Sequence, residues 1–80
     1  MPEPKLVLFT GPGCHLCEQA EQLCWQVGVA QSQLRKEDVT QRLEWKKAYG
    51  LRIPVLLRED SAAELGWPFD AGQLQDFLSS

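Results

Sequence analysis

The chain has 80 residues, of which 44% are hydrophobic and 24% charged, and its formal net charge is -3. This length allows one domain with a modest core, and the composition is typical of a folded protein. The acidic balance argues against a general nucleic-acid binder, and no apolar run reaches the roughly 20 residues that span a bilayer. We therefore expect one monomeric domain over residues 1–80, with neither nucleic acid nor membrane as a partner.

The amino-terminal segment, residues 1–5 (Met-Pro-Glu-Pro-Lys), is too polar for a secretory signal, so we expect a cytoplasmic protein. That compartment is reducing, which affects how the three cysteines are interpreted. In a reducing compartment a close cysteine pair is more often catalytic or metal-binding than a structural disulfide.

The first predicted unit is a buried strand, a tight turn and a helix. Residues 5–9 are mostly apolar, and the turn residues Thr10-Gly11-Pro12-Gly13 follow them. A helix is predicted to begin near Cys14 and to end near Gly28. Its expected apolar face consists of Leu16, Ala20, Leu23, Cys24 and Val27. With Leu16 pointing toward the core, Cys17 is expected to be less exposed than Cys14.

The middle of the chain is less clearly patterned. Residues 33–39 predict a weak strand at a sheet edge. Thr40 is expected to cap a helix over residues 40–49, with Leu43 facing inward and Gly50 ending the helix. Residues 53–57 predict the next strand, in which Pro54 belongs at the first position or at an edge because proline has no N–H to donate.

The last part of the chain predicts a hairpin and a helix. Residues 62–65 are a candidate partner strand, and residues 66–69 a loop. Asp70 and Gln73 have the spacing of a capping box, and the apolar face of the following helix is Leu74, Phe77 and Leu78. The predicted fold is α/β, in the order β-α-β-α-β-β-α, with a four-stranded mixed sheet flanked by three helices.

Cys14 and Cys17 form a Cys-x-x-Cys pair where the first strand gives way to a helix. The free N–H groups and the positive dipole end of the first helical turn favour a thiolate, so Cys14 is expected to have a lowered pKa and to act as the nucleophile. Cys17, about one turn further on, is expected to resolve the mixed disulfide. The alternatives are a chance pair of cysteines and half of a zinc site. Cys24 and His15 are poorly placed to complete four zinc ligands, so no metal is predicted.

The segment Phe9-Thr10-Gly11-Pro12-Gly13-Cys14-His15-Leu16-Cys17 resembles the active-site segment of glutaredoxins. More narrowly, it is similar to small bacterial glutaredoxin-like proteins with the motif Cys-His-Leu-Cys. Residues 49–55 (Tyr-Gly-Leu-Arg-Ile-Pro-Val) and 66–70 (Gly-Trp-Pro-Phe-Asp) fit the same group. The resemblance implies a thioredoxin fold, a cis Ile53–Pro54 bond beside the dithiol, and thiol–disulfide oxidoreductase activity without a bound cofactor.

The resemblance also implies that the substrate, an extended peptide of a disulfide-containing protein or glutathione, pairs with the backbone of Ile53. The predicted substrate-binding residues are Pro12, His15, Ile53, Pro54, Trp67 and Asp70. Glutaredoxins usually carry a glutathione-binding lysine where this chain has Gly11, and Arg42 or Arg52 are candidates to replace it. Glutathione as substrate or reductant therefore stays open.

Several residues keep two interpretations. His15 either assists the Cys14 thiolate or is an exposed spacer, and Trp67 either lines a substrate groove or packs against the last helix. Cys24 is predicted to be a buried apolar residue, because it lies roughly 10 Å along the helix from Cys17. Two other functions compete with the enzyme: a redox-inactive thioredoxin-fold module that binds proteins, and a metal or iron–sulfur site shared by two protomers.

Overall fold

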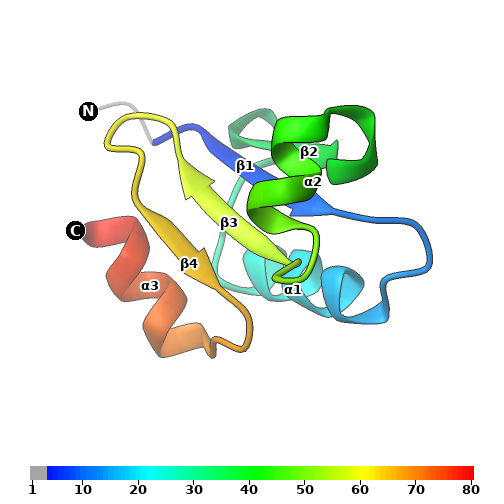
Figure 1. Cartoon of the computed structure of the whole chain (residues 1–80). Coiled ribbons are helices and arrows are strands. Elements are labelled where there is room, and N and C mark those ends of the chain that lie inside the picture. Colours follow the sequence, from blue (N-terminus) through cyan, green and yellow to red (C-terminus); the bar gives the residue numbers. More distant parts are fainter. Residues whose placement is uncertain (1–3) are drawn as a thin grey trace.

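A four-stranded sheet forms the centre of the computed structural model, which describes residues 4–80 (Figure 1). Its strands are β1 (Leu6–Thr10), β2 (Leu34–Asp38), β3 (Val55–Arg58) and β4 (Glu64–Gly66). In the spatial order β2-β1-β3-β4, β2 runs parallel to β1, while β3 is antiparallel to both β1 and β4. The predicted α/β class and the mixed sheet are confirmed.

Three α-helices cover the two faces of this sheet. α1 (His15–Gln26) and α3 (Ala71–Ser79) pack on one face, and α2 (Leu43–Tyr49) packs on the other (Figure 1). Short 3₁₀ turns at Gln31–Gln33 and Val39–Gln41 flank β2. The sheet therefore separates two apolar layers, and α1 begins at the end of the sheet where β1 ends.

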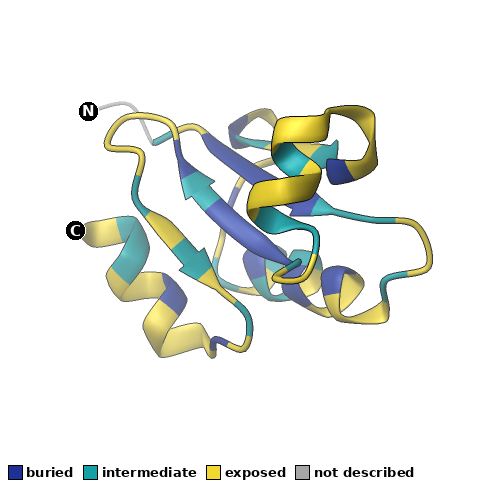
Figure 2. Cartoon of the chain, in the orientation of Figure 1, coloured by how far each residue is buried: buried dark blue, intermediate teal, exposed yellow. Residues whose placement is uncertain are grey.

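β1 supplies side chains to both layers, because successive residues of a strand point to opposite faces. Leu6 and Leu8 join the layer under α1 and α3, while Val7 and Phe9 join the layer under α2. Phe9 stacks on the ring of Tyr49 with ring centroids 4.2 Å apart. Figure 2 shows β1 and much of β3 as buried, which is typical of central strands covered on both faces.

The expectation that Leu16 points toward the core is wrong, since this residue is 45% exposed. The buried residues of α1 are Cys17, Ala20 and Cys24. Cys17 takes the inward position in the first turn, and Leu16 lies about 100° around the helix from it. The expected order of exposure nevertheless holds, because Cys17 is buried and Cys14 is intermediate.

Two expectations about the second helix are also wrong. Thr40 lies in the 3₁₀ turn Val39–Gln41, where its N–H donates to Asp38 (2.8 Å), and α2 begins only at Leu43 without a side-chain cap. Leu43 is 66% exposed. The helix turns Trp45 and Tyr49 toward the sheet instead, and a residue two positions before Trp45 faces away from it.

The predicted hairpin strand lies further along the chain than residues 62–65. Ala62 adopts φ of 61°, in the left-handed region, and its N–H donates to the Arg58 carbonyl in a turn (2.8 Å). β4 therefore begins at Glu64. The capping box of the last helix is present as predicted, with Asp70 accepting from the Gln73 N–H (2.8 Å) and Gln73 accepting from the Asp70 N–H (2.9 Å).

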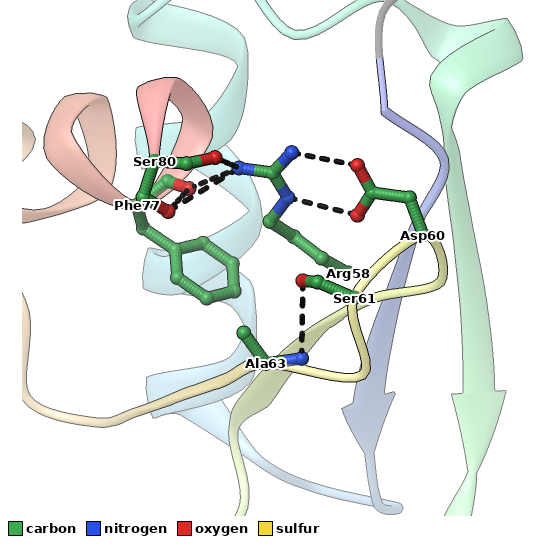
Figure 3. Close-up of polar contacts among 6 residues, drawn as sticks. All are labelled: Arg58, Asp60, Ser61, Ala63, Phe77 and Ser80. Atoms are coloured by element: carbon green, nitrogen blue, oxygen red, sulfur yellow. Dashed lines mark hydrogen bonds and ion pairs between the residues drawn. The ribbon is translucent and has the colours of Figure 1, made fainter.

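The buried guanidinium of Arg58 ties the end of β3 to the end of α3 (Figure 3). It donates two hydrogen bonds to the carboxylate of Asp60 (2.7 and 3.0 Å) and two more to the carbonyls of Phe77 (2.8 Å) and Ser80 (2.7 Å). Backbone carbonyls at a helix end lack partners within the helix, so Arg58 satisfies two that α3 leaves free.

Candidate active site

Cys14 is the residue from which α1 starts. β1 ends at Thr10, and a turn through Gly13, whose φ is +67°, reverses the chain so that Cys14 becomes the N-cap. The Cys14 Sγ accepts a hydrogen bond from the Cys17 N–H (3.1 Å). A sulfur at this position meets the free N–H groups and the positive end of the helix dipole, and both favour a negative charge on it.

Cys14 and Cys17 are joined as a disulfide, with Cα atoms 5.2 Å apart. Cys17 is only 4% exposed, whereas Cys14 is partly open to solvent. A substrate sulfur approaching from solvent therefore meets Cys14 first. Cys17 lies behind it, within bonding reach of the Cys14 sulfur.

The structure divides five of the six predicted binding residues between two separate hollows, neither of which is lined by Cys14 or Cys17. A groove of about 840 Å³ between α1 and the start of α3 is lined by His15, Trp67 and Asp70, among others. A second hollow of about 360 Å³, on the α2 side, is lined by Pro12 and Ile53. A third, of about 160 Å³, contains Cys14 and Cys17 themselves.

The Ile53–Pro54 bond is cis in the structure, as is the Trp67–Pro68 bond. Pro54 is fully buried, and its carbonyl accepts from the Trp67 N–H (3.1 Å). The N–H of Ile53 donates to the Tyr49 carbonyl (3.0 Å). That donor is thus engaged within the protein, which leaves the Ile53 carbonyl as the group that could pair with an extended substrate.

The two arginines considered as replacements for the glutathione-binding lysine have other partners. Arg52 donates to Glu64 (3.1 Å), and Arg42 lies 3.6 Å from Glu44. The space around Gly11 is also restricted. A Cβ at Gly11 would lie 2.8 Å from the Cδ1 atom of Ile53, so this isoleucine occupies the space that a side chain at Gly11 would need.

The third cysteine is separate from the pair. Cys24 is fully buried in the layer under α1, and burial, with a smaller effect from the charge of Glu21, raises its pKa from 9.0 to about 11. His15 is on the surface, with its side chain 91% exposed. Across residues 4–80, no three His, Cys, Asp or Glu side chains gather in a way that could hold a metal ion, and no helix has the length and apolar character to cross a membrane.

Sequence reasoning missed two residues at the dithiol, Glu21 and Lys36. Both line the hollow that contains Cys14 and Cys17, and their side chains form an ion pair. The spacing of Glu21, four residues after Cys17, places the two on the same helix face and was the available signal. Lys36 comes from β2, so only the sheet register could have placed it there.

Comparison with known proteins agrees with this geometry. The family model described as Glutaredoxin-like domain (DUF836) matches residues 5–79. The chain belongs to this glutaredoxin-like family. It is similar to the X-ray structure of protein XcR50 from X. campestris, at 35% identity and a TM-score of 0.83, with 92% of this chain and 95% of that chain covered.

A second similar structure is that of protein Ne2328 from Nitrosomonas europaea. This comparison gives 25% identity and a TM-score of 0.78, and covers 98% of this chain and 94% of that chain. No curated protein matches the chain. The glutaredoxin-like fold, together with the Cys14–Cys17 disulfide, fits a redox role for the domain.

Proposed function

We propose that this glutaredoxin-like chain is a thiol–disulfide oxidoreductase in which Cys14 attacks and Cys17 resolves. The observation that carries the proposal is the placement of a partly exposed Cys14 sulfur at the amino end of α1, with a buried Cys17 joined to it. A thiolate is the attacking species in disulfide exchange, and a helix amino terminus favours it.

The proposed reaction has two exchange steps. The Cys14 thiolate attacks one sulfur of a substrate disulfide, forming a mixed disulfide and releasing the first substrate thiolate. Cys17 then loses its proton and attacks the Cys14 sulfur, which releases the second substrate thiolate. The substrate disulfide gains two electrons and the dithiol loses them, leaving the Cys14–Cys17 disulfide for an external thiol to reduce.

The substrate is proposed to be a disulfide-containing protein, or glutathione in a mixed disulfide. One hollow is lined by Pro12 and Ile53 and another by His15, Trp67 and Asp70, and we propose that these residues contact the substrate on the two sides of the reacting disulfide. The buried Pro54 is proposed to fix the direction in which the carbonyl of Ile53 points. We propose also that the protein is a monomer, that it is cytoplasmic and that it has no bound cofactor.

The test is reduction of disulfides by the wild type and by Cys14→Ser. A peptide disulfide and a glutathione mixed disulfide serve as parallel substrates, each with glutathione or dithiothreitol as reductant. We expect the wild type to accelerate reduction of at least one substrate, and Cys14→Ser to lose the acceleration. A wild type no faster than Cys14→Ser with every pair would refute the enzyme and leave a redox-inactive binding module.

A further inference from the structure

The buried position of Cys17 raises the question of how its thiol loses a proton. With the Cys17 residue 4% exposed, bulk water has little access to it. The 160 Å³ hollow at the dithiol contains three charged side chains, those of Glu18, Glu21 and Lys36. Of these three side chains only a carboxylate can accept the proton of Cys17, because a lysine ammonium has no lone pair to offer.

Glu21 and Glu18 differ in their surroundings. The Glu18 side chain is 77% exposed and lies 3.6 Å from the ring of His15. The Glu21 side chain is only 22% exposed, and both of its carboxylate oxygens contact the Lys36 Nζ, at 3.1 and 3.3 Å. Glu21 also lies one helical turn after Cys17 on the same face of α1.

Two other observations place the carboxylate of Glu21 on the inner side of α1. Lys36 pairs with Leu8 in the register of β2 and β1, so the ion pair links the helix to the sheet beside the dithiol. The charge of Glu21 also reaches Cys24, the buried thiol one turn further along, and contributes to its raised pKa. Lys36 thus holds a largely buried carboxylate in a fixed position next to the hollow.

We propose that Glu21, oriented by Lys36, accepts the proton of Cys17 when Cys17 resolves the mixed disulfide. The inference rests on the proposed function and adds a proton acceptor to its second step. The proton moves from the Cys17 thiol to the Glu21 carboxylate, the Cys17 sulfur bonds to the Cys14 sulfur, and the substrate sulfur leaves with the electron pair of the broken bond. Glu21 then returns the proton to the departing thiolate or to water.

The two steps are separated by reaction of the reduced protein with dithiobis-nitrobenzoate. Attack by Cys14 releases one nitrothiobenzoate in a phase that depends on reagent concentration, and resolution by Cys17 releases a second in a phase that does not. The leaving group needs no proton, so the second phase reports proton removal from Cys17. We expect Glu21→Gln to slow that phase about a hundred-fold near neutral pH, the low end of the usual contribution of general base catalysis, and to leave the first phase unchanged.

Three matched variants keep the inference falsifiable. Glu18→Gln removes a carboxylate from the same hollow and is expected to leave the second phase and its pH dependence as in the wild type. Glu21→Asp keeps a carboxylate and is expected to recover part of the rate. Lys36→Met should slow the second phase less than Glu21→Gln does, because the acceptor remains but loses its orienting partner.

The possible failures are distinguishable. A wild type that releases both equivalents, with a second phase unaffected by Glu21→Gln, overturns this inference and leaves the proposed function intact. Equal slowing by Glu18→Gln also overturns it, because the effect would then come from the summed negative charge near the dithiol. Slowing by Lys36→Met without slowing by Glu21→Gln overturns it as well, because the effect would then come from the charge of the lysine. A wild type with no second phase refutes the proposed function itself.

Discussion

The buried thiol of Cys24 should make stability depend on alkaline pH in a calculable way. Its pKa is raised from 9.0 to about 11, chiefly by burial and secondarily by the charge of Glu21. A raised pKa means that the folded state keeps a proton that the unfolded state has already released. The contribution is therefore complete below about pH 9 and is lost as pH rises toward 11.

The size of the effect follows from the shift. One pKa unit corresponds to about 1.4 kcal/mol, so a shift of about two units, from 9.0 to about 11, amounts to roughly 3 kcal/mol at its limit. At pH 11 itself, where half of the folded molecules have ionised, about 2 kcal/mol should be lost. Replacing Cys24 by Ala should cost about 1 kcal/mol at neutral pH, because a small group leaves a small cavity.

The assay is urea unfolding between about pH 8 and pH 11, in a Cys14→Ser, Cys17→Ser background in which Cys24 is the remaining thiol. The comparison is with the Cys24→Ala variant of this background. Other titrating groups, such as Tyr49, are present in both proteins and cancel in the difference between their free energies of unfolding. We expect the protein with Cys24 to be the more stable near pH 8 and the less stable near pH 11. Stability curves that stay parallel across this range would refute a buried neutral thiol.

Three further predictions concern stability. Leu8→Ala, which empties a fully buried position of β1, should lower the free energy of unfolding by about 2–5 kcal/mol in urea titration, and a smaller loss would mean that the core collapses around the site. Asp70→Ala should lower the free energy of unfolding by about 1 kcal/mol, because it removes the cap of α3. Asp76→Ala, on the exposed face of the same helix, should change it by no more than about 0.5 kcal/mol. Equal effects would contradict the capping role. The hydrogen bond from Arg58 lowers the pKa of Asp60, so the contribution of Asp60 to stability is present above about pH 4 and is lost below it. Asp60→Asn should therefore flatten the acid side of a plot of melting temperature against pH. An unchanged acid side would contradict this.

The order of elements was predictable because strong local signals mark it. The apolar run before Thr10, the turn at residues 11–13 and the capping box at Asp70 each define a boundary by chemistry within a few residues. β2 was predicted as an edge strand from its weak alternation, and its position at the edge beside β1 confirms this.

The errors came from choices that the tertiary structure makes. Leu16 and Leu43 were assigned to the core because they are apolar, but Cys17 and Trp45 hold the inward positions of their helices. Hydrophobicity marks a candidate for burial, whereas the contact with the sheet decides which face of the helix is used. Thr40 likewise has the side chain of a cap, but Asp38 holds it in a 3₁₀ turn.

The dithiol was predictable from its motif, and its surroundings only in part. Cys14 and Cys17 are adjacent on one helix, so their spacing determined their proximity. The hollow beside them also uses Lys36 from β2 and Glu21 from the inner side of α1. Strand register brings these side chains together across 15 residues of sequence, and no local pattern encodes that meeting.

The most direct test of the central claim is the alkylation rate of Cys14 in the reduced protein. Iodoacetamide reacts with thiolates, so the rate reports ionisation and access together. In a Cys17→Ser, Cys24→Ala background, where Cys14 is the remaining thiol, we expect alkylation near pH 6 to be many-fold faster than that of an unfolded peptide containing residues 11–16. A rate equal to or below that of the peptide would contradict a reactive thiolate at the start of α1.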